Sequence, residues 1–450
     1  MEWYSALAVL LGSILVLMAL GMPVGIAFLG VNVVAAVAYF GGSGALASRI
    51  ETGIGTLAGN AFESMASFAI VPIPMFLLMG DLFFHTGLAA RMFNAVDKLM
   101  GKVPARLSYV TVAGGTAFAT LSGSSMGSTA LLGSLMVPEM TRRKYKHSMS
   151  IGPILGTGGL AMLIPPSALA VLLGTLAQID IGRLLVAGIT PGLLLAAMYT
   201  VLIYVRARLD PEAAPVYDIE EVSTGVKLRL FFVDVLPMIS IVGMVIVLIM
   251  AGVATPSEAA AFGGLGVIVL AFGYRLFSLA ALWKSLEGAA RVTVMALLIL
   301  FGSQTFSQIL AFSGGSAGLI RWVAGFEVSP IVMLLCMFGI LLLLGMFMDQ
   351  LAMMLLTVPI FFPIVATLDF GLPLEVKMIW FGVIMLMALE ISFTTPPFGL
   401  LLFVMKGVAP KGTSFAQICV AAVPFMGCAM LLVALMIAFP GLVTWLPFLG

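Results

Sequence analysis

The sequence predicts an all-α polytopic membrane protein, with about ten transmembrane helices and two re-entrant helical hairpins. Of its 450 residues, 62% are hydrophobic and only 9% are charged, and the mean hydropathy is +1.20. Soluble domains are about 45–50% apolar and about 25% charged, so a water-soluble fold has too few polar residues here to cover its exterior. The apolar runs are about 20 residues long, which suits membrane-crossing helices rather than the shorter strands of a barrel.

Charged residues separate ten apolar runs that are each long enough for one span. These lie near residues 5–20, 23–41, 62–84, 148–176, 183–205, 232–252, 256–274, 286–312, 376–405 and 415–440. Two further segments, 106–141 and 328–368, are about twice as long as one helix. Each is interrupted in its middle, at 122–125 and at 345–349. Such breaks survive at membrane depth only where protein or a cavity satisfies the freed backbone groups, so we expect two re-entrant hairpins.

The distribution of Lys and Arg predicts the orientation, because cytoplasmic loops of membrane proteins are enriched in these residues. With the N-terminus outside, 17 of the 21 Lys and Arg residues lie in inner loops. The four outer ones are Arg49, Arg183, Arg321 and Lys377. Both termini are then periplasmic, and the two hairpins enter from opposite faces, the first from the cytoplasm.

The chain is predicted to be an inverted repeat. Residues 1–205 hold five spans with hairpin 106–141 and broken span 148–176, 206–230 form a polar cytoplasmic linker, and 231–450 hold five spans with hairpin 328–368 and broken span 376–405. An odd number of crossings per half inverts the second copy. Pro165-Pro166 recurs as Pro396-Pro397 at an offset of 231, and Pro191 recurs as Pro424 at 233. Residues 88–103 and 316–327 precede the hairpins as amphipathic arm helices, or alternatively as plain loops.

Four irregular places fall at membrane depth: the two hairpin tips, and the interruptions of the two broken spans. Unwound turns free backbone carbonyls, which together with Ser or Thr hydroxyls and one carboxylate form an oxygen cage suited to a hard cation such as sodium. Helix N-termini beyond each break favour an anionic group. Alternatively, the small residues only allow close packing and the prolines only bend helices. Asp349 and Glu390 are carboxylates near mid-membrane, where charge is usually functional, although Glu390 could equally be a packing residue.

Five segments of the chain, in order and correctly spaced, match one known family. They are SGSSMGSTALLGSLMVPEM (122–140), GGLAMLIPPSALAVLLG (158–174), GVATPSEAAAFG (252–263), LGMFMDQLAMMLLTVPIFFP (344–363) and LEISFTTPPFGLLLFVMKGVAP (389–410). Over essentially its whole length the chain resembles the large membrane subunit (the M, or DctM-like, subunit) of tripartite ATP-independent periplasmic (TRAP) transporters.

The resemblance implies a function. Such a subunit is not an enzyme but part of a secondary transporter in the bacterial inner membrane. It uses a sodium gradient to take up a small organic anion, of the carboxylate or sulfonate class, delivered by a periplasmic substrate-binding protein. It works beside a small four-helix membrane subunit, expected here as a separate chain because the sequence starts at the large subunit's first span. The fold is of the elevator type, and sodium is the coupling ion, with no other cofactor.

The resemblance also implies site residues. One sodium site would use Ser122, Gly123, Ser124, Ser125, Gly158, Gly159 and Pro165. The other would use Gly345, Met348, Asp349, Thr394 and Thr395. The substrate would lie near Ser124, Pro166, Ser167, Thr395 and Pro397. The chain departs from the family at Asp349-Gln350, where Asp-Pro is more usual, but the carboxylate is kept.

Other functions are open or excluded. A sodium or proton dicarboxylate symporter of the same superfamily, which needs no binding protein, is the alternative. An intramembrane serine hydrolase at 122–125 lacks a base, because the only histidines are His85 and His147. The chain has no P-loop, which excludes an ATP-driven pump. A net charge of +1 disfavours nucleic acid, and three cysteines without a CxxC pair indicate neither a disulfide nor a metal site.

Overall fold

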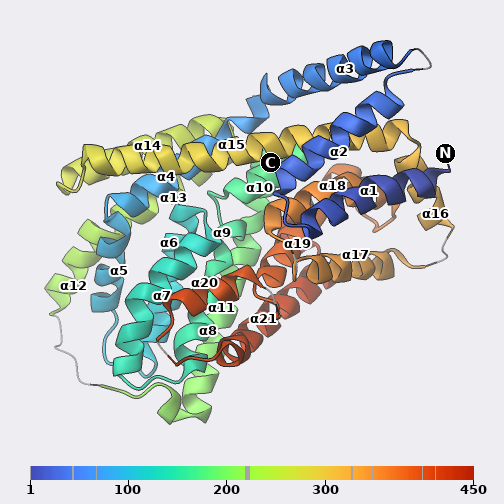
Figure 1. Ribbon diagram of the computed structural model, residues 1–450. Helices are drawn as coiled ribbons and strands as arrows, with labels where there is room; N and C mark the ends of the chain where they lie inside the picture. The colour runs from blue at the N-terminus through green and yellow to red at the C-terminus, as the bar shows by residue number, and fades with distance from the viewer. Residues whose placement is uncertain are drawn as a thin grey trace.

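The computed structural model describes residues 2–42, 45–66, 68–217, 223–325, 328–346, 348–397, 399–410 and 412–449. Over these ranges the chain is helical and contains no strand (Figure 1). Seven helices are long and apolar enough to cross a membrane, or up to nine if each of two bent pairs is one span. The predicted class, an all-α polytopic membrane protein, is confirmed.

The described helices include α-helices that range from four residues in α9 and α22 to 34 residues in α15. Their bounds are α1 (Trp3–Ala19), α2 (Val24–Tyr39), α3 (Leu46–Ala66), η1 (Phe68–Ile70), α4 (Pro72–His85), α5 (Leu88–Leu99), α6 (Arg106–Ser122), α7 (Ser125–Arg142), α8 (His147–Gly158), α9 (Leu160–Leu163), α10 (Ala168–Ala177), α11 (Ile181–Leu209), η2 (Pro211–Ala213), α12 (Thr224–Leu230), η3 (Phe231–Val235), α13 (Leu236–Met250), α14 (Pro256–Gly273), α15 (Leu279–Phe312), α16 (Gly315–Ala324), α17 (Pro330–Leu344), α18 (Gln350–Thr367), α19 (Leu374–Phe393), α20 (Leu400–Val408), α21 (Phe415–Ala438) and α22 (Gly441–Thr444).

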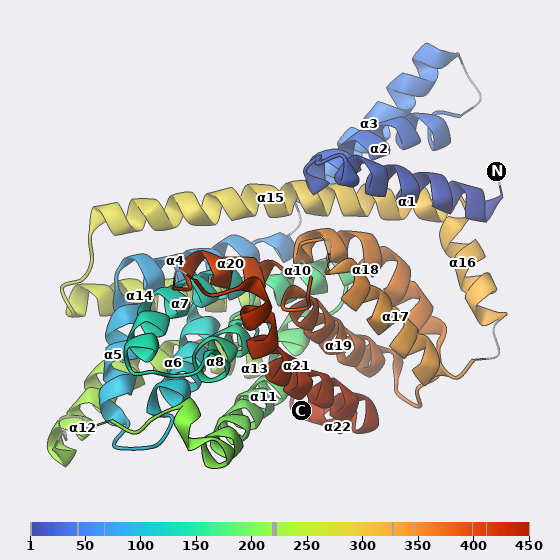
Figure 2. The same cartoon turned by 60° about the horizontal axis from the view of Figure 1, so that its bottom comes forward.

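The longest helix, α15, separates two parts of the molecule. It has 34 residues, which at 1.5 Å per residue is about 50 Å. Figure 2 shows α1, α2 and α3 on one side of α15 and most other helices on its other side. The amide of Asn32 in α2 donates to the carbonyl of Gly302 in α15 at 2.7 Å. A separate apolar cluster joins α1, α2 and α15, and includes Leu355 and Leu356 of α18.

All ten predicted spans contain helix, but the third is not one helix. The structure corrects the span at 62–84, because α3 ends at Ala66 and α4 begins at Pro72. Pro72 has no N–H to bond the preceding turn, so it fits at the start of a helix and not inside one. The polar residues of 46–66, among them Arg49, Glu51 and Glu63, hid α3 from a search for apolar runs.

Both predicted hairpin breaks are present. The first lies between α6 and α7, which end and begin at Ser122 and Ser125, and the second between α17 and α18, at Leu344 and Gln350. The helices of each pair pack against one another. The arm segments are helices too, α5 and α16, so the plain-loop alternative is wrong; α5 turns 64° away from α4. The inverted duplication itself stays a prediction.

The linker is shorter than predicted. Helix α11 continues to Leu209, so only the part after it connects the two halves, and it includes the short helices η2 and α12. Lys146 pairs with Asp210 at 2.6 Å, and the N–H of Lys146 donates to the carbonyl of Ala213 at 2.9 Å. The start of the linker therefore lies against the loop that follows α7.

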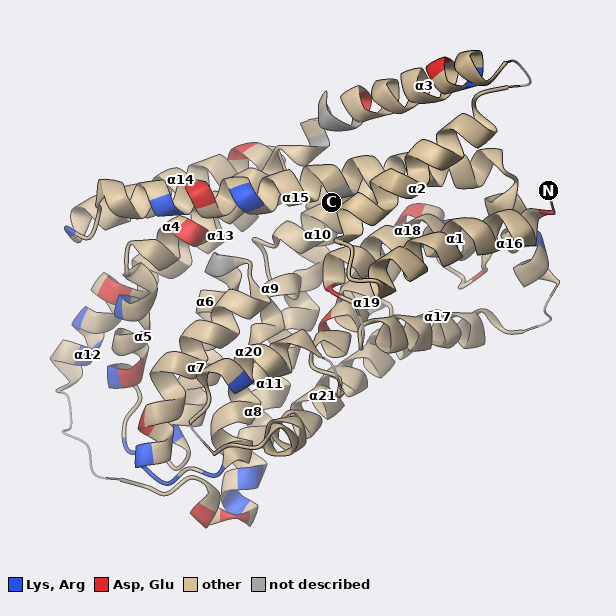
Figure 3. Ribbon diagram, in the orientation of Figure 1, with Lys and Arg blue, Asp and Glu red and all other residues tan. Residues whose placement is uncertain are grey.

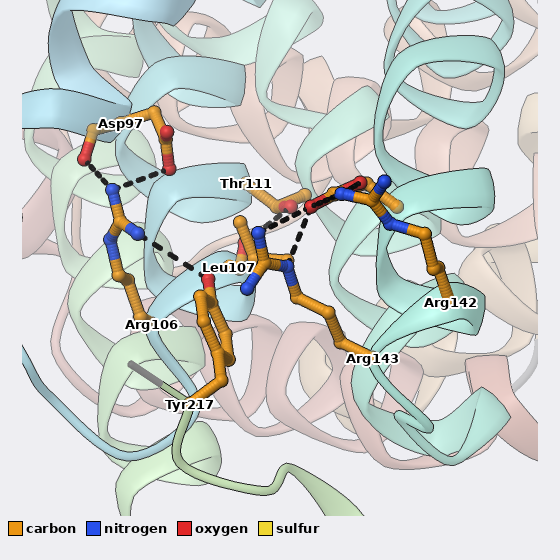
Figure 4. A network of polar contacts seen from close by, with 8 residues as sticks. Asp97, Arg106, Leu107, Thr111, Arg142, Arg143 and Tyr217 are labelled. Atoms are coloured by element: carbon orange, nitrogen blue, oxygen red, sulfur yellow. Dashed lines mark hydrogen bonds and ion pairs between the residues drawn. The ribbon is translucent and has the colours of Figure 1, made fainter. Parts of the chain in front are cut away.

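A polar network fastens the same linker to the base of the first hairpin (Figure 4). Arg106, at the start of α6, pairs with Asp97 at 3.0 Å and donates to the hydroxyl of Tyr217 at 3.4 Å. The guanidinium carbon of Arg143 lies 3.5 Å from the centre of the Tyr217 ring, and Arg143 pairs with Glu139 at 2.6 Å. Burial raises the pKa of Tyr217 above its ordinary value, so its hydroxyl stays neutral.

Candidate functional site

The first hairpin tip lies against the break of the first broken span. Gly123 ends α6 with a φ of +58°, a conformation that side chains disfavour, and the hydroxyl of Ser124 caps α7 by accepting from the N–H of Gly127 at 3.1 Å. A Cβ atom on Gly123 would lie 3.5 Å from the carbonyl oxygen of Pro166 and 3.9 Å from the nitrogen of Ala168. The tip therefore approaches the backbone where α10 begins.

The sequence predicts that the first broken span is interrupted at Gly158-Gly159 and at residues 164–167, and the structure has both interruptions. Helix α8 ends at Gly158, and α10 begins after Ser167, bent by 45° from the preceding segment. The Pro165-Pro166 bond is cis, and the hydroxyl of Ser167 accepts from the N–H of Ala170 at 3.2 Å. The carbonyl oxygen of Leu163 would be closer than 3.0 Å to a Cβ atom on Gly188. Helix α11 thus packs directly against the backbone at the break.

The second tip contacts the second broken span. Helix α17 ends at Leu344, and the carboxylate of Asp349 caps α18 by accepting from the N–H of Ala352 at 2.9 Å. Asp349 and Met348 are half-buried. Gly345 is buried, and a Cβ atom there would be closer than 3.0 Å to the side chain of Ser392 in α19. The second tip and α19 are in direct contact.

The second broken span unwinds after Phe393. The hydroxyls of Thr394 and Thr395 both donate to the carbonyl of Ile391, at 3.0 and 2.7 Å. The Pro396-Pro397 bond is cis, and α20 begins at Leu400. A Cβ atom on Gly399 would lie 2.7 Å from the carbonyl oxygen of Phe393 and 2.9 Å from that of Thr395, so the turn needs glycine.

The predicted site residues therefore fall into two groups. The tip residues and the breaks are brought together in pairs, Gly123 with Pro166 and Gly345 with α19. Ser125 is buried beside Gly158. In contrast, Asp349, Ser167, Thr394 and Thr395 make their described hydrogen bonds within their own helix ends. The side chain of Ser122 lies outside the described residues.

Three buried polar residues at this place were not among the predicted ligands, although the sequence had named Glu390 and left its role open. Glu390 accepts a hydrogen bond from the hydroxyl of Ser125 at 3.3 Å, across 265 residues of sequence. Thr129 lies one helical turn beyond Ser125 and is fully buried. Gln350 is also buried, and its amide nitrogen lies 3.5 Å from the carbonyl of Leu389. The available signal was a carboxylate inside the apolar run of α19, whose role the sequence left open.

Residues 11–442 match the family model described as "Tripartite ATP-independent periplasmic transporter, DctM component". The chain belongs to this family. It is 32% identical over 396 residues to the C4-dicarboxylate TRAP transporter large permease protein DctM of Pseudomonas aeruginosa, with 87% of each chain covered. It is 31% identical to the isethionate TRAP transporter permease protein DctMQ of Oleidesulfovibrio alaskensis, covering 99% of this chain and 66% of that one.

Relatives with other named substrates are also similar to this large permease. The ectoine TRAP transporter large permease protein TeaC of Halomonas elongata is 25% identical, with 97% of this chain and 98% of the relative covered. These relatives are transporter permeases and not enzymes, so this TRAP permease is a transport protein as predicted. TRAP transporters work with a periplasmic binding protein and a small membrane subunit, which decides against the binding-protein-independent alternative.

Solved structures share the fold at low sequence identity. The YdaH transporter of Alcanivorax borkumensis has a TM-score of 0.65 at 14% identity, covering 94% of this chain and 99% of that chain. MtrF of Neisseria gonorrhoeae has a TM-score of 0.56 at 15% identity, covering 95% and 96%. At this identity the likeness concerns the fold alone, which is a helical transporter fold.

Proposed function

We propose that this TRAP permease couples the sodium gradient to uptake of a small organic anion, of the carboxylate or sulfonate class, by an elevator mechanism. A periplasmic binding protein delivers the anion, and a small four-helix subunit, as a separate chain, sits beside the permease in the bacterial inner membrane. The observation that carries the proposal is the pairing of each hairpin tip with a broken helix, Gly123 with Pro166 and Gly345 with Ser392. In transporters built from two repeats, the binding site usually lies near the middle of the membrane, where discontinuous helices of the two halves meet.

The chemistry of the tips supports cation binding. The second tip offers the half-buried carboxylate of Asp349, and the break of α19 offers the hydroxyl and carbonyl oxygens of Thr394 and Thr395. The first tip offers the hydroxyls of Ser124 and Ser125 and the backbone around Gly158 and Gly159. Hydroxyl, carbonyl and carboxylate oxygens are the ligands that hard cations take in proteins.

The helix starts support an anionic substrate. Helices α7 and α10 begin after Ser124 and Ser167, and the contact of Gly123 with the start of α10 brings these two N-termini together. Free N–H groups and the helix dipole favour negative charge at such a place. The substrate would lie near Ser124, Pro166, Ser167, Thr395 and Pro397, where the four breaks face one another in the proposed arrangement.

The arrangement around α15 supports an elevator. Helices α1, α2 and α15 share the smaller apolar cluster, and the broken helices and most of the two hairpins belong to the larger one. We propose that the first group is the static part and that the hairpins and broken helices move against it. Contacts of Leu355 and Leu356 with the first group would change during this movement.

Transport in a reconstituted system tests the proposal. The permease, its small subunit and the binding protein are placed in proteoliposomes, and uptake of labelled C4-dicarboxylate, isethionate, sialic acid and ectoine is compared. We expect uptake of one acid only when sodium is outside and the binding protein is present, with potassium at equal ionic strength as the control. Equal uptake in potassium would exclude sodium coupling, and selective uptake of ectoine over all the acids would exclude the anion class.

A further inference from the structure

Glu390 occupies an unusual position for a carboxylate. It lies near the end of α19, only 5% exposed, in a helix that is buried almost along its whole length. Its Oε2 accepts the hydrogen bond from Ser125, but its Oε1 has no hydrogen-bond partner within the described part of the chain. Among the described residues no Lys or Arg forms an ion pair with it. A buried carboxylate that no cation balances is costly inside a membrane protein, so this side chain needs an explanation.

The unpartnered oxygen lies against a glycine of the opposite half. A Cβ atom on Gly159 would be closer than 3.0 Å to Oε1, Cδ and Cγ of Glu390, so the carboxylate fills the space that this glycine leaves open. Gly159 precedes Glu390 by 231 residues, the same offset that relates Pro165-Pro166 to Pro396-Pro397. If the chain is duplicated as predicted, Gly159 is the residue of the first half that corresponds to Glu390. The carboxylate therefore packs against its own counterpart.

A second oxygen without a partner lies at the neighbouring glycine. Thr129 is 0% exposed, and its hydroxyl has no hydrogen-bond partner among the described residues. A Cβ atom on Gly158 would lie 2.5 Å from that hydroxyl oxygen and 3.4 Å from the carbonyl oxygen of Ser125. Ser125 lies next to both groups, because its hydroxyl bonds Oε2 of Glu390 and its carbonyl oxygen lies near the same glycine as the hydroxyl of Thr129.

A small cavity adjoins the carboxylate. It has a volume of about 20 Å³, enough for one water-sized species, and Glu390, Tyr199 and Thr394 are among the residues that line it. Leaving a buried polar group without a hydrogen bond costs about 1–3 kcal/mol. Two such oxygens occur here, Oε1 of Glu390 and the hydroxyl oxygen of Thr129. A cation that binds Glu390 would satisfy its unpaired oxygen and balance the charge of the carboxylate; Thr129 contacts Gly158 and is not one of the residues that line the cavity.

We propose that Glu390 is the anionic ligand of the first cation site, which it shares with Thr129 and Ser125 beside Gly158-Gly159. This inference rests on the proposed sodium coupling and adds residues to it. The two sites then differ: Asp349 belongs to the second hairpin's own tip, whereas the first site takes its charge from α19, in the other half of the chain. Because α19 also contacts the second tip through Ser392, a single helix touches both cation sites.

Sodium binding to the purified permease tests this inference. The melting temperature and the bound ²²Na⁺ are measured against sodium, with potassium keeping ionic strength constant. Glu390→Gln keeps the shape and removes the charge. We expect its half-saturating sodium concentration to rise at least tenfold and its bound sodium to fall by one per chain, while its melting temperature in potassium does not fall. Wild-type affinity and stoichiometry in this variant would overturn the assignment.

A second substitution covers the case in which Glu390→Gln does not fold. Thr129→Val removes only the unpartnered hydroxyl, and we expect a threefold or larger loss of sodium affinity. Thr111→Val is the matched control, since Thr111 is equally buried but already bonds the carbonyl of Leu107 at 2.7 Å. Equal sodium affinity in Thr129→Val and Thr111→Val would refute the site. If the wild-type chain binds no sodium, sodium coupling itself is refuted. If the wild type binds sodium and both variants bind it equally well, only this inference is refuted.

Discussion

Gly345 and Ser392 touch so closely that any side chain at position 345 would overlap that of Ser392. Gly345 directly follows α17 at the second hairpin tip, and Ser392 is fully buried one residue before the end of α19. The hydroxyl of Ser392 donates to the carbonyl of Leu389 at 2.7 Å, so its own position is fixed by α19. The second tip can therefore lie this close to the broken helix only because residue 345 has no Cβ atom.

Gly345→Ala should separate the second tip from α19. Overpacking of this kind costs about 1–3 kcal/mol, and we expect a lower melting temperature and weaker sodium-dependent uptake. Gly339→Ala is the control, because Gly339 lies in the same helix with open space around it. The double variant Gly345→Ala with Ser392→Gly should recover part of the loss. Equal behaviour of the 345 and 339 variants would contradict the close contact.

Gly123→Ala should disturb the first tip through its backbone conformation. Adopting a φ of +58° costs a non-glycine residue about 1–2 kcal/mol, whereas the new methyl group would make only an ordinary contact with the carbonyl of Pro166. Gly371→Ala is the matched comparison, with a φ of +69° and no atom nearby. We expect both variants to lose stability but only Gly123→Ala to lose transport. Transport rates that fall equally in both would assign the effect to strain alone.

The sequence predicted the breaks better than it predicted what they touch. Gly123, Pro165-Pro166 and Gly345 interrupt helices for local reasons, which are visible in any apolar run. The contact between Glu390 and Ser125 joins residues 265 positions apart and depends on how two helices are placed in space. No pattern along the chain encodes that placement. Helix α3 was missed for the opposite reason, since its polar residues resemble a loop when only apolar runs are counted.

Asp349→Asn should weaken sodium binding without unfolding the second tip. Asn caps a helix about as well as Asp, so the hydrogen bond to Ala352 is kept and the melting temperature in potassium should barely change. A ligand that binds only the folded state stabilises it by about 2.7 kcal/mol at a hundredfold excess over Kd. We expect the sodium-induced rise in Tm to shrink at equal sodium concentration. An unchanged rise would remove Asp349 from the proposed ligands.

Tyr217→Ala should release the linker from the first hairpin. The ring lies under the guanidinium of Arg143, and such contacts are worth about 0.5–1 kcal/mol at partly exposed sites. The N–H of Lys146 bonds the linker carbonyl of Ala213, so its hydrogen exchange reports whether the linker is docked. We expect about two- to fivefold faster exchange in Tyr217→Ala. Tyr217→Phe keeps the ring, and exchange as fast as in Tyr217→Ala would argue against the ring contact.

The proposed orientation can be tested with single cysteines on opposite sides of the membrane. Lys and Arg residues gather at the ends of the helices around α5, α12 and the loop after α7 (Figure 3). Arg142 in that region and Arg321 in α16 are both exposed. The native Cys336, Cys419 and Cys428 are free thiols and are first replaced by Ser. We expect a membrane-impermeant maleimide to label Arg142→Cys only in inside-out vesicles.

Arg321→Cys is the counterpart for the outer face, and we expect it to react only in right-side-out spheroplasts. The physical reason is the preference of Lys and Arg for the cytoplasmic side, which places 17 of 21 such residues inside in the proposed orientation. Detergent-solubilised protein should label at both positions, which shows that both thiols are reactive. Labelling of Arg142→Cys in spheroplasts, together with protection of Arg321→Cys, would show that the chain has the opposite orientation in the membrane. The first hairpin would then open to the periplasm, and the proposed entry side of the substrate would have to change with it.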